Sequence, residues 1–142
     1  MTAKAKDYLE QGLRLDNRIN SKIEQLAELN ALAARATSTL SGMPHSPNGA
    51  SSGLENVIMK IVTLQEEINA DIDRLVDLKR EIMEKISQIE DTDLRMVLEY
   101  RYLCEESFPD IAVKMNLSAR HPYYLHELAL KAFQTILGED SA

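Results

Sequence analysis

The strongest constraint on the fold of this chain is a seven-residue repeat of aliphatic side chains in its middle. The repeat runs without interruption through Leu54, Ile61, Ile68, Leu75, Ile82 and Ile89. Such spacing places the side chains on one side of an α-helix and is typical of coiled-coil packing. A helix over residues 53–90 is about 57 Å long, and it cannot bury this stripe alone. The sequence therefore predicts a helix that packs against other helices.

Residues 3–40 predict a partner helix for this stripe. Apolar side chains recur there at steps of three, four or seven between Tyr8 and Leu40, so they share one helix face. The intervening residues 41–53 are rich in Ser, Gly, Pro and Asn, which predicts a flexible connector. A Ser52–Glu55 capping box marks the expected start of the second helix. We therefore expect an all-α fold whose residues 1–90 form a long antiparallel helical hairpin, similar to a coiled coil.

The apolar stripe of the second helix is wider than one partner helix covers. It also takes in Val57, Leu64 and Leu78, and Ile58, Ile72 and Ile86 form an alternate seam. This width leaves room for helices of another copy. The sequence predicts a homo-oligomer, in the simplest case a dimer, with its interface at the heptad positions Leu54, Ile61, Ile68, Leu75, Ile82 and Ile89.

Residues 91–138 predict a second domain, a helix-turn-helix of three short helices. Acidic residues near Thr92 favour the start of a helix there, and Ser107 is suited to cap the next one. Asn116 tolerates the left-handed conformation that a tight turn needs, and Ser118 is the expected N-cap of the last helix. The residues of that helix that we expect to be buried are Leu125, Leu128, Ala129, Ala132, Phe133 and Ile136.

This C-terminal half resembles the fourth conserved region of bacterial sigma factors. The match lies in Arg95, Arg101-Tyr102, Ile111-Ala112, Leu117-Ser118 and Ala129-Leu130. Together with the run LVDLKREI at 75–82, residues 53–137 resemble small uncharacterised proteins of phages and prophages of Gram-positive bacteria. Their layout is similar to that of phage late-gene transcriptional regulators. The resemblance implies a helix-turn-helix that acts in transcription.

The chain departs from that pattern at two positions. Relatives usually carry a β-branched apolar residue at the position of Pro122 and a basic residue at the position of Tyr124. Proline disfavours helical geometry at the residue before it, here His121. We therefore expect the last helix to begin at Pro122 rather than Ala119, and both departures to lie outside the apolar stripe of that helix.

The predicted nucleic-acid surface surrounds the start of the last helix. Arginine can read guanine, and serine or tyrosine can bind phosphates. The candidate DNA-binding residues are Lys114, Ser118, Arg120, His121, Tyr123 and Tyr124.

The net charge of the C-terminal half argues against DNA binding. Residues 91–142 hold 5 basic and 9 acidic side chains, a net charge of −4, whereas DNA affinity draws on phosphate neutralisation. Two functions therefore stay open. One is a phage-type transcription regulator that binds double-stranded DNA, RNA polymerase or both. The other is an interaction protein whose acidic helical surface binds or blocks a host protein without contacting DNA.

Signatures of metal binding and catalysis are absent from the sequence. His121 and His126 are five residues apart, so they do not share a helix face as a metal pair would. No Glu-x-x-His motif, glycine-rich phosphate loop or nucleophile signature occurs. We expect no enzyme activity, no metal and no cofactor. The single cysteine, Cys104, predicts a reducing compartment. The lack of a long apolar run or a secretory signal predicts a cytoplasmic protein without membrane contact.

Overall fold

In the computed structural model, residues 2–40 and 50–141 are described, and their regular elements are helical throughout. They are α1 (Ala3–Leu40), α2 (Ala50–Ile86), α3 (Thr92–Leu98), the π-helical segment η1 (Glu99–Leu103), α4 (Phe108–Lys114) and α5 (His121–Ser141). No strand occurs in these two ranges, and the predicted all-α class is confirmed.

The bounds of α1 agree with the sequence, whereas those of α2 differ. Because α2 begins at Ala50, Ser52 lies inside the helix, and the predicted capping box at that residue is wrong. The helix also ends at Ile86, four residues before the predicted end at residue 90. Most of the predicted connector, residues 41–49, lies outside the described part of the chain.

The chain divides into two compact units, and each long helix contributes to both. Unit 1 comprises Met1–Leu15 and Leu75–Ala142, and unit 2 comprises Asp16–Arg74. The division therefore cuts α1 and α2. The first turns of α1 and the last turns of α2 belong to the same unit as the C-terminal helices.

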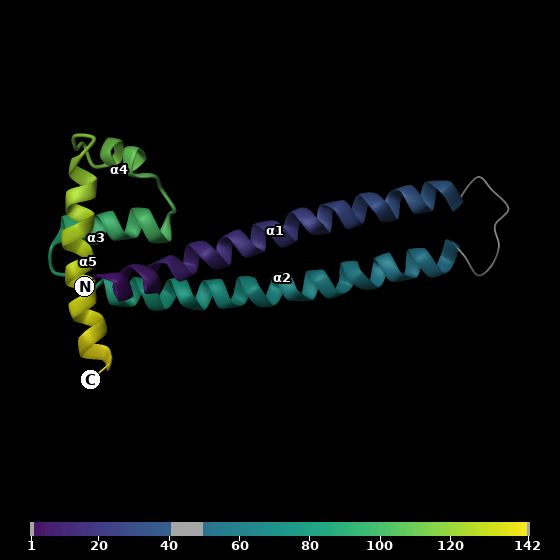
Figure 1. Ribbon diagram of the computed structural model, residues 1–142, viewed down its shortest axis with the longest axis horizontal. Helices are drawn as coiled ribbons and strands as arrows, with labels where there is room; N and C mark the ends of the chain where they lie inside the picture. The colour runs from purple at the N-terminus through teal and green to yellow at the C-terminus, as the bar shows by residue number, and fades with distance from the viewer. Residues whose placement is uncertain (1, 41–49, 142) are drawn as a thin grey trace. The chain divides into compact units, whose positions relative to one another are not determined.

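In unit 2, the segments of α1 and α2 lie side by side and run antiparallel (Figure 1). The apolar side chains buried between them are those of Ile19, Leu64 and Ile68. The Nζ atom of Lys22 donates a hydrogen bond to Oδ2 of Asp71 at 2.6 Å. This hydrogen bond is the main cause that lowers the pKa of Asp71. A carboxylate is tolerated in the seam because its ammonium partner is only 18% exposed and reaches it directly.

The core of unit 1 joins the start of α1, the end of α2 and α5. Its buried members are Ala5, Leu9, Ile82, Ile86, Ile89, Leu98, Tyr102, Ala129, Leu130, Phe133 and Ile136. A polar contact reinforces this packing, since the backbone N–H of Ala5 donates to Oε1 of Gln134 at 3.0 Å. The rings of Tyr8 and Phe133 are 5.7 Å apart. The N-terminal turns of α1 therefore form part of the scaffold that holds α5.

The six heptad residues fall into two groups by burial. Ile68, Ile82 and Ile89 have less than a tenth of their surface exposed within the single chain. Consequently, they have little surface left for a partner, and their burial comes from the chain's own helices. Leu54, Ile61 and Leu75 are half-buried. A role in self-association stays a prediction for these positions.

Replacing Gly12 by alanine should stabilise the fold. Gly12 lies inside α1, and a Cβ atom added there meets no atom of a neighbouring element within 4 Å. Because glycine costs about 1 kcal/mol relative to alanine in a helix interior, Gly12→Ala should raise the free energy of unfolding by about 0.5–1 kcal/mol. Urea denaturation measures it. Gly138→Ala near the end of α5 is the control, with a smaller expected effect. A destabilised Gly12→Ala variant would show that the site is more crowded than the structure indicates.

Candidate nucleic-acid interface

The turn between α4 and α5 has the backbone conformation that its sequence predicts. Asn116 is left-handed, with φ at 56°. The N–H of Leu117 donates to the carbonyl of Ala112 at 2.8 Å, and that of Asn116 donates to the carbonyl of Val113 at 3.2 Å. This pair of bonds is the Schellman arrangement that ends a helix. It fixes the direction in which the chain leaves α4.

The N-terminal caps of α3 and α4 also follow from their residues. Oδ1 of Asp91 accepts hydrogen bonds from the N–H groups of Asp93 and Leu94, so α3 starts at the predicted Thr92. The hydroxyl of Ser107 accepts from the N–H of Asp110 at 3.2 Å. The predicted N-cap role of Ser118 is wrong, because α5 begins three residues later, at His121.

A small apolar core fixes α4 against α3 and α5. Val97, Ile111 and Leu125 are buried there, and Phe108 and Leu117 pack against them. Of the α5 residues expected to be buried, Leu125, Ala129, Phe133 and Ile136 are buried, whereas Leu128 and Ala132 are half-buried. The same helix also buries His126 and Leu130, which the apolar spacing did not identify.

The two departures from the sigma-factor pattern lie in different environments. Pro122 is among the fully buried side chains, so the expectation that it lies outside the buried surface of α5 is wrong. Its ring is apolar and occupies the first turn of α5, where a missing N–H costs nothing. Tyr124 is 61% exposed, as expected.

All six predicted DNA-binding residues are exposed, and they extend from the end of α4 to the first turn of α5. The structure brings some of them into contact. The ring centroids of His121 and Tyr124 are 5.9 Å apart. The ring centroids of Tyr123 and Phe108 are 4.5 Å apart, and Tyr123 is 53% exposed. The surface therefore combines aromatic rings, one hydroxyl from Ser118 and two cations.

The two cations of this surface differ in their surroundings. Lys114 forms an ion pair and a hydrogen bond with Glu106. That hydrogen bond is the main cause that raises the pKa of Lys114. Arg120 forms no ion pair or hydrogen bond among the described residues. Arg120 is therefore the cation of this surface that is ready to meet a phosphate or a base.

Beside this surface lies a pocket of about 360 Å³ with a tyrosine–histidine pair at its wall. The hydroxyl of Tyr102 and Nε2 of His126 are 2.7 Å apart. Burial raises the pKa of Tyr102 to about 12 and lowers that of His126 to about 4. Both side chains are therefore neutral near pH 7, and the bond links η1 to α5 inside unit 1.

Arg101 closes one side of this pocket. Its guanidinium carbon lies 4.5 Å from the centroid of the Phe108 ring, and Nη1 donates to the carbonyl of Glu106 at 3.0 Å. Sequence spacing missed these contacts and the pairing of Lys114 with Glu106, because they join positions that share no helix face. Three of the five basic side chains of residues 91–142, those of Arg95, Arg101 and Lys114, are bound to groups of the chain itself.

The environment of His126 predicts a loss of stability in mild acid. Its pKa is about 4 in the folded chain against 6.5 for an unperturbed histidine, so the unfolded chain binds the proton first as pH falls. The stabilisation is fully present above pH 6.5 and is lost between pH 6.5 and 4. It amounts to at most about 3 kcal/mol, since solvent in the pocket screens the charge.

Urea denaturation at several pH values measures this loss. His126→Gln should flatten the stability profile between pH 6.5 and 4 relative to the wild-type chain. His121→Gln, at an exposed histidine, should leave the profile unchanged. Equal profiles for His126→Gln and the wild-type chain would contradict the assignment of this pH dependence to His126.

Within the described residues, no group of three or more His, Cys, Asp or Glu side chains is arranged to hold a metal ion. In the same ranges, no helix has the combined length and apolar character that a membrane crossing needs.

Comparisons with known proteins place the chain in a family but supply no activity. No curated protein matches the chain. No solved structure matches it. The sequence model of one family, described as "Protein of unknown function (DUF1492)", matches residues 42–134. Since this span covers about two thirds of the sequence, the chain belongs to that family.

Proposed function

We propose that this chain is a phage-type transcription regulator that acts through DNA, RNA polymerase or both. The observation that carries the proposal is the exposed start of α5, where Arg120 directly precedes His121 and has no ion-pair or hydrogen-bond partner among the described residues. A helix-turn-helix contacts base edges with the first residues of its second helix. The resemblance of the C-terminal half to the fourth region of sigma factors and of residues 53–137 to phage proteins also supports the proposal.

The charge of the module determines what kind of DNA binding we expect. With a net charge of −4 over residues 91–142, general attraction to the phosphate backbone is weak. Binding then depends on a few contacts around Arg120, and on Ser118, Tyr123 and Tyr124 as hydrogen-bond donors to phosphates. The protein should therefore prefer particular sequences and bind random DNA poorly.

The main prediction concerns the two cations. Arg120→Ala should weaken binding to a selected DNA site by about 1–3 kcal/mol if the arginine reads a base. Lys114→Ala should have a smaller effect, because that lysine is already bound to Glu106. Selection from a random DNA pool at low salt, followed by fluorescence anisotropy, measures both. Lys131→Ala, at an exposed lysine later on α5, is the control and should not change the affinity.

A further variant sharpens this test. Glu106→Gln removes one negative charge and releases Lys114, so it should increase DNA affinity and steepen the salt dependence by about one phosphate contact. If the pool enriches no sequence and neither Arg120→Ala nor Glu106→Gln changes binding, DNA recognition by this surface is wrong.

The second candidate function is an interaction protein that binds or blocks a host protein without contacting DNA. The observation that favours it is the internal use of Arg95, Arg101 and Lys114, which leaves the surface of an acidic module with few available cations. Such a surface suits a basic protein partner. In this function, the exposed rings of Tyr123 and Tyr124 contribute apolar contact area.

A pull-down from host lysate, with and without nuclease, separates the two functions. A transcription regulator that acts through DNA should lose its partners when nuclease is added. RNA polymerase that stays bound after nuclease treatment indicates direct contact with the enzyme, and Tyr124→Asp should reduce its recovery. Recovery of a nuclease-resistant partner unrelated to transcription would favour the interaction protein.

A further inference from the structure

Unit 2 buries few apolar side chains for its length. Among its described residues, those with less than a tenth of their surface exposed are Ile19, Leu64, Ile68 and Asp71. Large apolar side chains remain exposed on both helices, including Ile23 at 46%, Ile58 at 47% and Val62 at 44%. Two antiparallel helices form a single layer, and the edges of their apolar stripes face solvent.

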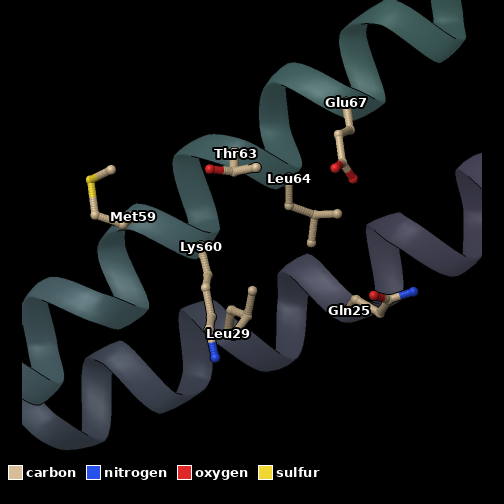
Figure 2. Close-up of a pocket in the computed structure, with 7 residues that line it drawn as sticks. All are labelled: Gln25, Leu29, Met59, Lys60, Thr63, Leu64 and Glu67. Atoms are coloured by element: carbon tan, nitrogen blue, oxygen red, sulfur yellow. The ribbon is translucent and has the colours of Figure 1, made fainter.

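One face of this layer holds a groove, which Figure 2 shows. The groove has a volume of about 340 Å³, and both Lys60 and Glu67 line it. Leu64 points from α2 toward α1, whereas Met59 points away from the partner helix (Figure 2). Charged groups of both signs make this face a poor candidate for apolar packing.

The opposite face carries an apolar stripe. With 3.6 residues per turn, the α2 positions 58, 62, 65, 69 and 72 share one helix face, about a quarter-turn from the seam and on the side away from the groove. They are Ile58, Val62, Gln65, Asn69 and Ile72, all exposed and none charged. The same spacing places Ile23 of α1 on this face, with the small residues Ala27 and Ala34, the polar Asn30 and, at the end of the unit, Asp16.

We propose that this face is the homodimer interface, so that the unit 2 segments of two copies pack face to face as four helices. The proposal is independent of DNA binding. The proposed interface also differs from the heptad positions predicted from the sequence, of which Ile68, Ile82 and Ile89 are buried within the chain. Hereafter the dimer face means Ile23, Ile58, Val62, Gln65, Asn69 and Ile72.

The dimensions of the dimer face suit a stable dimer. The α1 segment of unit 2 is about 35 Å long, and two adjacent helices are about 20 Å wide, which gives roughly 700 Å² per copy. Each partner in a stable interface contributes about 800 Å². A second copy therefore covers the stripe with an interface of ordinary size.

The charges beside the dimer face suit a second copy arranged about a two-fold axis. On the α2 edge, helical spacing places the acidic residues Glu55, Glu66 and Asp73, whereas the α1 edge presents Glu24 and Arg35, which have opposite charges, beside the uncharged Asn20 and Ala31. A two-fold arrangement that sets α2 of one copy over α1 of the other keeps the acidic edges apart. The central amides of Gln65 and Asn69 can both donate and accept hydrogen bonds across such an interface.

Light scattering after size exclusion, in reducing buffer, tests the proposal on the full chain. The wild-type chain should have twice the monomer mass of 16.0 kDa at micromolar concentrations. Val62→Glu and Ile72→Glu should each weaken the dimer at least about 100-fold, with unchanged helical circular dichroism. Met59→Glu, at a side chain 63% exposed on the groove side, is the matched control and should stay dimeric.

A gain-of-function variant keeps the test decisive if the glutamate variants fail to fold. Gln65→Leu removes a polar residue from the centre of the stripe and should tighten the dimer at least about tenfold. An interface of this size should hold two copies together at a concentration of about 100 μM. The proposal is overturned if both the wild-type chain and the Gln65→Leu variant are monomeric at that concentration. It is also overturned by a dimer that Met59→Glu dissociates and Val62→Glu leaves intact.

Discussion

The packing of the first turns of α1 against α5 is the interaction on which the C-terminal module depends. Ala5 and Leu9 are completely buried beside Phe133 and Ile82, and the backbone of Ala5 is bonded to Gln134. The helix-turn-helix is short, since α3 and α4 have seven residues each, and helices of that length are not stable alone. Residues from the two ends of the chain therefore complete one core, which holds the start of α5 in place.

The packing of α5 against its neighbours matters because the exposed first turn of α5 carries candidate binding residues. The Tyr102–His126 bond fixes η1 to α5, and Phe108 of α4 contacts both Arg101 of η1 and His126 of α5. Arg120, His121 and Tyr124 stand on this scaffold with their side chains exposed. A surface presented in this way loses little conformational entropy when it binds, which favours recognition through few contacts.

The basic side chains of residues 91–142 differ in whether they are bound to other groups of the chain. A count over residues 91–142 treats all five as equal, but in the structure three of them are bound to groups of the chain itself. The module therefore offers fewer available cations to a phosphate backbone than its net charge suggests. The functional proposal consequently rests on the local surroundings of Arg120 rather than on general basic character.

Helix positions could be predicted from the sequence to a large extent, because they depend on local spacing and local capping. Apolar periodicity predicted α1 over its full length, and the start of α3 followed from the acidic cap. The Asn116 turn was also predictable, since few residue types tolerate a left-handed backbone there. The early end of α2 at Ile86 was not, because Ile89 continues the heptad while it packs in the core of unit 1.

The sequence by itself determined the all-α class, the order of the helices and the exposed character of the six candidate binding residues. Each of these follows from the residue types and their distance along the chain. Tertiary structure alone decided which cations stay available, which residues accompany the apolar stripe of α5, and which stripe of α2 is left uncovered. Lys114 meets Glu106, and Pro122 and His126 become buried, because the fold brings together side chains that share no helix face. Periodicity gives the face of a helix on which a residue lies, but it does not show which other segment covers that face.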